Sequence, residues 1–129
     1  MTETVSILYV DDEPDIRLIV EMSLRMRPDI TVRTAGSGEE ALDLLIDQGW
    51  RPDVLMVDVM MPGLTGPDVL AALLEEPATA DLPVIFVTAR ARPQDLDAYI
   101  GQGARGVITK PFDPMKFADQ VLALLGRSL

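Results

Sequence analysis

Four apolar runs of this chain each end beside a side chain that can do phosphate or metal chemistry. Asp11 and Asp12 follow the first run, Asp58 follows another, Thr88 a third, and Lys110 the last. In an open parallel sheet, ligands bind beyond the carboxyl ends of the strands, near the switch in strand order. We therefore expect these residues, although distant in sequence, to converge on one site.

Three converging aspartates repel one another, so the site requires compensation. A like-charge pair at ~4 Å costs about 4 kcal/mol at a dielectric constant typical of a protein surface. Protonation or a divalent cation relieves this repulsion, and hard oxygen ligands favour Mg²⁺, with Mn²⁺ as the alternative. Beside such a metal, Asp58 can act as a nucleophile, because carboxylates form aspartyl-phosphates. Lys110 would then pair with phosphoryl oxygens as a point charge, and the Thr88 hydroxyl would donate a hydrogen bond to another.

Each residue also has a purely structural interpretation. Asp11 and Asp12 can cap the helix that follows them and interact with its dipole. Asp58 can be an ordinary turn residue, Thr88 an ordinary strand-end residue, and Lys110 a solvated charge. The chemical interpretation is favoured because four strand ends in one chain carry the needed group, in the right order. Lys110 adds to this, since the chain uses Arg nine times and Lys only twice.

The elements that must position these residues alternate between short β-branched runs and longer helical patterns. Strands are predicted at 5–10, 31–35, 53–57, 82–87 and 106–108. Early prolines, glycines beyond the ends and a capping box of Ser37 and Glu40 delimit the helices. These are predicted from Pro14 to about Met26, Ser37 to Gly49, Pro67 to Leu74, Pro93 to Ile100, and Pro114 to Leu125. Such alternation predicts an α/β fold, a doubly wound five-stranded parallel sheet with helices on both faces.

Composition limits the function classes. The 129 residues, 48% of them hydrophobic, are enough for one domain with its own core. The absence of cysteine excludes disulfides and thiolate metal sites. The beginning of the chain lacks a signal-peptide pattern, and no apolar run approaches the roughly 20 residues that span a bilayer, so a cytoplasmic protein without membrane insertion is expected. A net charge of −10 argues against direct binding to nucleic acid.

The motifs resemble those of response-regulator receiver domains of two-component signalling, of the chemotaxis-receiver type. The matching segments are Leu8-Tyr-Val-Asp-Asp-Glu-Pro14, Val57-Asp-Val-Met-Met-Pro-Gly63 with Gly66, Val87-Thr-Ala89, and Lys110-Pro-Phe112. The resemblance covers the whole chain and implies a flavodoxin-like (βα)5 receiver fold. It implies that residues 1–129 form a single stand-alone receiver domain with no output domain.

The resemblance also implies a role for each site residue. Asp58 would accept a phosphoryl group from a histidine kinase or a histidine phosphotransfer protein, and Thr88 and Lys110 would contact that group. The Mg²⁺ ligands would be the carboxylates of Asp11, Asp12 and Asp58 and the backbone carbonyl of Met60. The domain would then change conformation and control an unidentified protein partner. It would not be a conventional enzyme, although it would support its own phosphoryl transfer and autodephosphorylation. The Lys110-Pro111 bond is expected to be cis, as is common in the family.

Two positions depart from the family pattern. Val107 stands three residues before the lysine, where the family often has Tyr or Phe. This departure puts the usual aromatic switch in doubt. Met60 is apolar at the position two residues after the acceptor, which is expected to alter the lifetime of the phosphorylated state.

Three rival functions share part of this pattern. A phosphatase of the haloacid dehalogenase type also uses a nucleophilic Asp after a strand, but it needs a second Asp two residues later as general acid, where this chain has Met60. A flavodoxin-like cofactor binder needs a small-residue loop after the first strand, where this chain has Asp-Asp-Glu-Pro. A degenerate receiver that binds a partner without phosphorylation is disfavoured because all five core residues are present.

The first predicted helix carries more apolar residues than one core stripe requires. Ile16, Val20 and Leu24 lie on one stripe that suits the sheet. The remaining apolar residues are either scattered surface positions or a docking site for a helical kinase or phosphotransfer domain. In the second interpretation, Ile19 is the residue expected to dock the partner.

Overall fold

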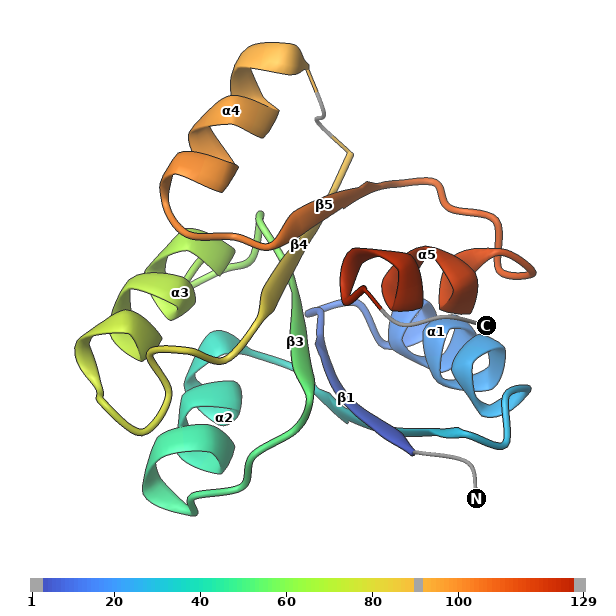
Figure 1. The fold of residues 1–129 in the computed structure, drawn as a ribbon, viewed down its shortest axis with the longest axis horizontal. Coiled ribbons are helices and arrows are strands. Elements are labelled where there is room, and N and C mark those ends of the chain that lie inside the picture. The colour runs from blue at the N-terminus through green and yellow to red at the C-terminus, as the bar shows by residue number, and fades with distance from the viewer. Residues whose placement is uncertain (1–3, 90–91, 127–129) are drawn as a thin grey trace.

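The centre of the fold is a parallel sheet. The computed structural model describes residues 4–89 and 92–126. Its sheet has five parallel strands in the order β2-β1-β3-β4-β5 (Figure 1). The strands are β1 (Val5–Val10), β2 (Ile30–Ala35), β3 (Val54–Asp58), β4 (Val84–Thr88) and β5 (Gly106–Thr109). Every residue of β3 and β4 is buried, as expected for strands that are covered on both faces.

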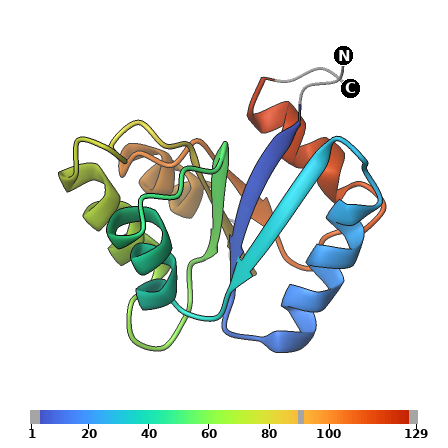
Figure 2. The ribbon, with the colours of Figure 1, turned by 90° about the horizontal axis from the view of Figure 1, so that it is seen from below.

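Helices cover both faces of this sheet. α1 and α5 lie on one face, and α2, α3 and α4 lie on the other (Figures 1 and 2). Their bounds are α1 (Pro14–Arg25), α2 (Gly38–Leu42) with a π-helical continuation η1 (Asp43–Asp47), α3 (Gly66–Glu75), α4 (Pro93–Gly101) and α5 (Phe117–Leu124). Within the described part of the chain, none of these helices has the length and apolar character needed to cross a membrane. The predicted doubly wound α/β fold is confirmed.

Alternating residues of the central strands divide the core into two layers. On β1, Ile7 and Tyr9 pack with α1 and α5, whereas Leu8 and Val10 pack with the helices of the other face. This follows from the alternation of side chains along a strand. Tyr9 contacts the ring of Phe117 on α5 edge-on, with centroids 6.4 Å apart. Both faces therefore fix the strands, and with them the residues at their carboxyl ends.

Helix capping differs from the prediction in two places. The Ser37 hydroxyl accepts a hydrogen bond from the N–H of Glu40 at 3.1 Å, as predicted. The Glu40 carboxylate, however, accepts from the N–H of Gly36 at 2.8 Å, so the reciprocal half of the box goes to the neighbouring residue. A complete capping box forms instead at the start of α3, between Thr65 and Asp68.

The last helix begins later than predicted, at Phe117 rather than Pro114. The Asp113 carboxylate accepts a hydrogen bond from the N–H of Met115 at 2.9 Å, and its carbonyl accepts one from the N–H of Lys116 at 2.9 Å. These bonds form a turn that precedes the helix. Local side-chain competition for backbone donors thus delays the helix by one turn.

Gly66, the first residue of α3, packs against the backbone at the end of β3. A Cβ atom added there would lie 2.8 Å from the carbonyl oxygen of Asp58 and 3.1 Å from the Cα of Val59. Because these are backbone atoms, no side-chain rotation can relieve the contact. Because Gly66 has no side chain, the start of α3 can pack directly against the end of β3 and hold it in place.

We predict that Gly66→Ala lowers the free energy of unfolding by about 1–3 kcal/mol, the usual cost of overpacking. Gly101→Ala is the matched control, since a Cβ added at this position of α4 meets no atom within 4 Å and alanine reduces the entropy of the unfolded chain. Urea unfolding followed by circular dichroism measures both variants. Equal unfolding free energies for the two variants would contradict the close packing of Gly66.

Candidate functional site

A lysine and two aspartates meet at the carboxyl edge of the sheet. The Nζ of Lys110 donates hydrogen bonds to Oδ2 of Asp58 at 2.7 Å and to Oδ2 of Asp11 at 2.9 Å. Asp11 directly follows β1, Asp58 is the last residue of β3, and Lys110 directly follows β5. Both aspartates are buried, and the lysine side chain is 17% exposed. The structure thus brings together three of the predicted site residues.

The two carboxylates stabilise the charge of Lys110. Burial of the ammonium group by itself lowers its pKa, but the hydrogen bonds to Asp58 and Asp11 and the charges of these carboxylates raise it, and the net pKa of Lys110 lies above its ordinary value. The lysine is therefore protonated at neutral pH. One positive charge faces two carboxylates, which leaves the cluster able to accept a further cation.

Asp11 is held from several directions. Its Oδ2 also accepts a hydrogen bond from the Tyr9 hydroxyl at 2.9 Å, and its Oδ1 accepts one from the N–H of Glu13 at 3.0 Å. Its backbone carbonyl accepts one from Nη1 of Arg17 at 2.7 Å. Burial, together with the negative charges of Asp11, Asp58 and Glu13, raises the pKa of Tyr9. The Tyr9 hydroxyl therefore keeps its proton and remains a donor.

Asp58 is held by the loop that follows β3. Its Oδ1 accepts a hydrogen bond from the N–H of Met60 at 3.1 Å. The N–H of Val59 donates to the carbonyl of Val87, and the N–H of Gly66 donates to the carbonyl of Val59, both at 3.1 Å. Met60 is 70% exposed. The backbone near Asp58 is therefore fixed, while the apolar side chain of Met60 lies at the surface.

Neighbouring carboxylates form a candidate cation site. Carboxylate oxygens of Asp11, Asp12 and Glu13 lie within 4.8 Å of one another, and Asp58 is joined to Asp11 through Lys110. Oxygen donors of this kind suit a hard divalent cation, so the residues fit the Mg²⁺ that the sequence predicts. Glu13 was not predicted as a ligand, although its position next to Asp12 is a usable signal.

Tyr9 is the other site residue absent from the sequence prediction. It is fully buried within an apolar strand, so its ring fits the core pattern and hides the role of its hydroxyl. Its spacing of two from Asp11 is the signal that would have found it, because residues two apart on a strand face the same side.

Thr88 ends β4 next to the cluster. It is buried, and its backbone carbonyl accepts a hydrogen bond from the N–H of Lys110 at 2.8 Å. The Lys110-Pro111 peptide bond is cis, as predicted. Val107 is half-buried and lies opposite Phe86 in the register of β4 and β5. The fold thus places Thr88 where the sequence predicts it and leaves β5 without an aromatic ring at position 107.

An apolar hollow of about 400 Å³ borders the cluster. Apolar side chains of α1 and of the segments that follow β4 and β5 line it together with Glu13 and Lys110, namely Ile16, Ile19, Ala89, Pro111, Phe112 and Pro114. Ile19 is 43% exposed. An apolar surface is therefore available directly beside the lysine that contacts Asp58.

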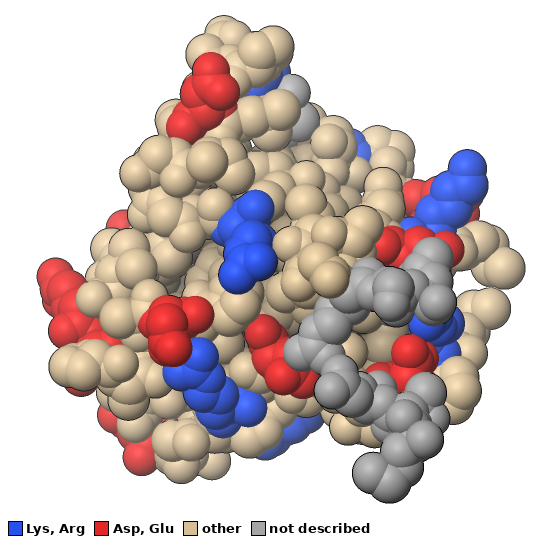
Figure 3. All heavy atoms as spheres, in the orientation of Figure 1, with Lys and Arg blue, Asp and Glu red and all other residues tan. Residues whose placement is uncertain are grey.

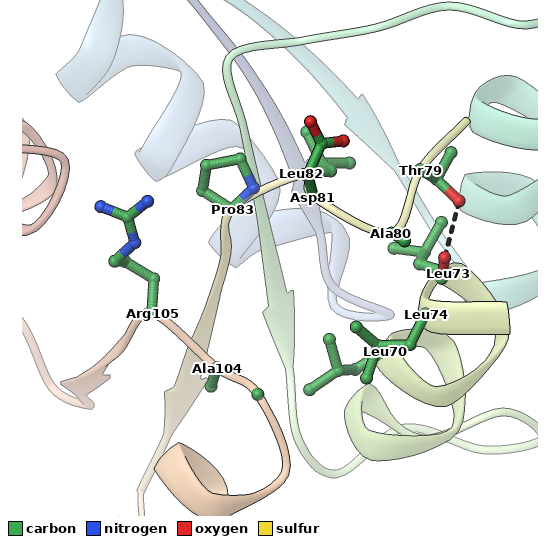
Figure 4. Close-up of a pocket in the computed structure, with 11 residues that line it drawn as sticks. Leu70, Leu73, Leu74, Thr79, Ala80, Asp81, Leu82, Pro83, Ala104 and Arg105 are labelled. Carbon is green, nitrogen blue, oxygen red and sulfur yellow. Dashed lines mark hydrogen bonds between the residues drawn. The ribbon is translucent and has the colours of Figure 1, made fainter. Parts of the chain in front are cut away.

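The hollow in Figure 4 lies at the opposite edge of the sheet. Leu82 and Pro83 line it just before β4 begins, and Arg105 lines it just before β5 begins. The dashed bond in Figure 4 joins the Thr79 hydroxyl to the carbonyl of Leu73 at 2.8 Å and stabilises the turn after α3. This hollow is therefore separate from the carboxylate cluster.

Basic and acidic side chains are interspersed on the face in Figure 3. Among the described residues, Arg27 pairs with Asp29 at 3.1 Å and with Asp119 at 3.0 Å, and Arg51 pairs with Asp81 at 2.9 Å. The described residues of this face form no continuous basic field of the kind that binds nucleic-acid phosphates.

Comparisons with known proteins agree with this geometry. The family model of the response regulator receiver domain matches residues 7–122. Response regulator Rre1 of Synechocystis sp. is 37% identical over 127 residues, which cover 98% of this chain and 54% of Rre1. Transcriptional regulatory protein AfsQ1 of Streptomyces coelicolor is 37% identical over 124 residues, which cover 95% of this chain and 52% of AfsQ1. The chain spans about half the length of these relatives.

Solved structures share the whole fold. Chemotaxis response regulator CheY4 of Vibrio cholerae has a TM-score of 0.84 and 30% identity over 94% of this chain and 98% of CheY4. The receiver domain of Francisella response regulator 1452 has a TM-score of 0.83 and 27% identity over 95% of this chain and 98% of that one. Because sequence and fold match over nearly the entire chain, the chain belongs to the response regulator receiver domain family and is a receiver of two-component signalling.

Proposed function

We propose that this receiver accepts a phosphoryl group on Asp58 from a histidine kinase or a histidine phosphotransfer protein. The observation that carries the proposal is the contact of Lys110 Nζ with Asp58 at 2.7 Å and with Asp11 at 2.9 Å. A carboxylate at a strand end can attack phosphorus, and a fixed ammonium group beside it can pair with the oxygens of the product. We infer that residues 1–129 act as one receiver unit, because all five strands belong to one sheet.

In the transfer step, a carboxylate oxygen of Asp58 forms a bond to phosphorus while the P–N bond of the donor's phosphohistidine breaks. The imidazole leaves with the bonding electron pair and takes up a proton. Lys110 moves from the Asp58 and Asp11 carboxylates to a phosphoryl oxygen, and the Thr88 hydroxyl donates to another. The phosphoryl group adds roughly one further negative charge, which increases the attraction for Lys110.

Mg²⁺ or Mn²⁺ is the proposed cofactor. Asp11, Asp12 and Asp58 would hold it through carboxylate oxygens and Met60 through its backbone carbonyl. When bound, the cation neutralises negative charge on the phosphoryl oxygens. Two hydrogen-bond donors besides Lys110 orient the buried Asp11 carboxylate, so the site is preorganised for a cation.

Hydrolysis returns the domain to its resting state. Water attacks phosphorus, the bond between phosphorus and the Asp58 oxygen breaks, and inorganic phosphate leaves. Met60 provides no general acid at the position two residues past the acceptor, which disfavours a conventional phosphatase. We therefore propose slow autodephosphorylation rather than turnover of a substrate.

We predict that Asp58→Asn abolishes phosphorylation, because the amide lacks the nucleophilic oxygen. With acetyl phosphate and Mg²⁺, intact-mass spectrometry should show the wild-type domain gaining one phosphoryl group and the variant gaining none. Asp81→Asn is the control, since it removes an exposed carboxylate that pairs with Arg51 and lines the hollow at the opposite edge of the sheet. Labelling of Asp58→Asn at the wild-type level would place the acceptor at another residue.

The donor must bring its phosphohistidine to Asp58, and α1 offers a surface for it. Val20 and Leu24 are buried as predicted, and Ile16 is half-buried. Four apolar residues of the same segment remain exposed: Leu18, Ile19, Met22 and Met26. Of these four, Ile19 lines the apolar hollow beside Lys110. We infer that this hollow docks a helical kinase or phosphotransfer domain.

We predict that Ile19→Lys slows phosphoryl transfer from the cognate donor about tenfold, the effect of losing roughly 1.4 kcal/mol of binding free energy at an apolar anchor. Acetyl phosphate labelling should be unchanged, because it needs no docking. Met26→Lys is the matched control, since Met26 is exposed on the same segment but does not line the hollow. If both activities of Ile19→Lys fall equally, the defect is in folding and the docking assignment fails.

The conformational change produced by phosphorylation must reach the surface without an aromatic side chain at position 107. Val107 has a short β-branched side chain with few rotamers, so a large rotation there cannot be the readout. None of the residues of α4 (Pro93–Gly101) is fully buried. Tyr99 of α4 contacts Phe86 edge-on, with centroids 5.2 Å apart. We infer that the signal passes from Thr88 through the loop 89–93 to α4; Arg90 and Ala91 of that loop lie outside the described residues.

The size of this shift is bounded by the new contacts. A switch from 1:99 to 99:1 needs about 5.5 kcal/mol of differential stabilisation. Hydrogen bonds to charged groups supply roughly 1.5–3 kcal/mol each, and Lys110 and Thr88 provide one or two of them. We therefore expect an incomplete shift on phosphorylation, which partner binding completes.

We predict that Thr88→Ala is still phosphorylated but loses the NMR shift changes that phosphorylation produces in the segment 89–100. Val107→Ala should keep these changes, since its side chain takes no part in the path. Amide spectra of both variants with and without acetyl phosphate provide the measurement. A response that survives in Thr88→Ala and disappears in Val107→Ala would reverse the assigned path.

A further inference from the structure

We propose that Tyr9 is a positioning residue that holds the carboxylate of Asp11 in its Mg²⁺-binding orientation, both in the resting state and after Lys110 has moved to the phosphoryl group. The observation is the hydrogen bond from the Tyr9 hydroxyl to Oδ2 of Asp11 at 2.9 Å. The inference rests on the proposed phosphoryl transfer at Asp58 and deepens it.

The Tyr9 hydroxyl has a position set by the core. Tyr9 and Asp11 are both 0% exposed, so solvent cannot readily replace the hydrogen bond between them. The ring lies within β1 and packs edge-on against Phe117 of α5, with centroids 6.4 Å apart. A donor on a rigid strand, fixed by packing, orients its acceptor better than one on a mobile side chain.

The same oxygen of Asp11 serves two donors in the resting state. Oδ2 accepts from the Tyr9 hydroxyl and from Lys110 Nζ, each at 2.9 Å. When Lys110 turns to the phosphoryl group, this oxygen loses one of them. A buried acceptor left without a donor is costly. Tyr9 keeps the oxygen satisfied and thereby lowers the cost of releasing Lys110.

A tyrosine hydroxyl suits this task because it is neutral. An ammonium group that is hydrogen-bonded to Asp11 repels an entering cation. A hydroxyl group donates one hydrogen bond to Asp11 and adds no positive charge. A carboxylate has about four acceptor positions, so the bonds from Tyr9 and from the N–H of Glu13 leave room for a metal. Donors that orient a metal ligand in this way typically contribute 10–100-fold to metal affinity.

The test is Tyr9→Phe, which keeps the ring and removes the donor. Mg²⁺ binding is measured from the amide shifts near Asp12 and Asp58. We expect about tenfold weaker binding, with acetyl phosphate labelling reduced at limiting Mg²⁺ and restored by excess Mg²⁺. Tyr99→Phe is the control, because it removes the other of the two tyrosine hydroxyls of the chain and should leave Mg²⁺ affinity unchanged. Unchanged or tighter Mg²⁺ binding by Tyr9→Phe overturns the inference.

A double-mutant cycle separates positioning from a general effect on structure. In an Asp11→Asn background, Tyr9→Phe should change Mg²⁺ affinity by less than about twofold, because the carboxylate that it orients is gone. The same tenfold loss in both backgrounds would show that Tyr9 acts independently of Asp11 and would overturn the inference.

A third readout uses the unmodified protein and does not depend on the folding of a variant. The buried hydroxyl proton of Tyr9 should be visible by NMR and should shift when Mg²⁺ is added. A hydroxyl resonance that Mg²⁺ leaves in place overturns the positioning role. If the wild-type domain binds Mg²⁺ and is not labelled by acetyl phosphate, the proposed function fails while the Tyr9 assignment is still decided by the Mg²⁺ titrations.

Discussion

One ammonium group between two carboxylates is the contact on which the rest of this structure depends. Without Lys110, the carboxylates of Asp11 and Asp58 would repel one another, and a like-charge pair at ~4 Å costs about 4 kcal/mol at a surface-like dielectric. The lysine is separated from them by 99 and 52 residues of chain. The contact therefore forms only when β1, β3 and β5 have the correct order, which the two packed faces of the sheet enforce.

In the proposed mechanism, the same contact makes the resting state a competitor of the phosphorylated state. Lys110 contacts both Asp58 and Asp11, and under the proposed mechanism it would have to leave these carboxylates to pair with a phosphoryl oxygen. Charged groups that are buried without compensation are expensive, so the exchange is feasible only because the new group is more negative than the carboxylate it replaces. If Asp58 is the acceptor as proposed, the strength of this contact sets the free energy that phosphorylation must supply to release Lys110.

Sequence patterns predict the parts of this site that depend on strand ends, and they miss the parts that depend on side-chain geometry. Asp58 and Thr88 are predictable because strands covered on both faces are continuous apolar runs whose ends are sharp. Tyr9 is missed because its ring satisfies the apolar pattern of β1 while its hydroxyl bonds Asp11. The late start of α5 is missed for a similar reason, since the turn at Asp113 depends on a side-chain hydrogen bond.

The carboxylate cluster and the apolar hollow share one packed wall. Tyr9 bonds Asp11, its ring contacts Phe117 edge-on, and Phe117 packs against Phe112 with ring centroids 4.3 Å apart. Phe112 lines the hollow together with Ile19. Because packed interiors are dense and resist small displacements, a change in the position of Asp11 has to be accommodated by this ring stack. Any molecule bound in the hollow contacts Phe112, which is the end of that stack. The surface proposed to receive the donor is therefore connected, through direct packing contacts, to the residues proposed to hold the metal.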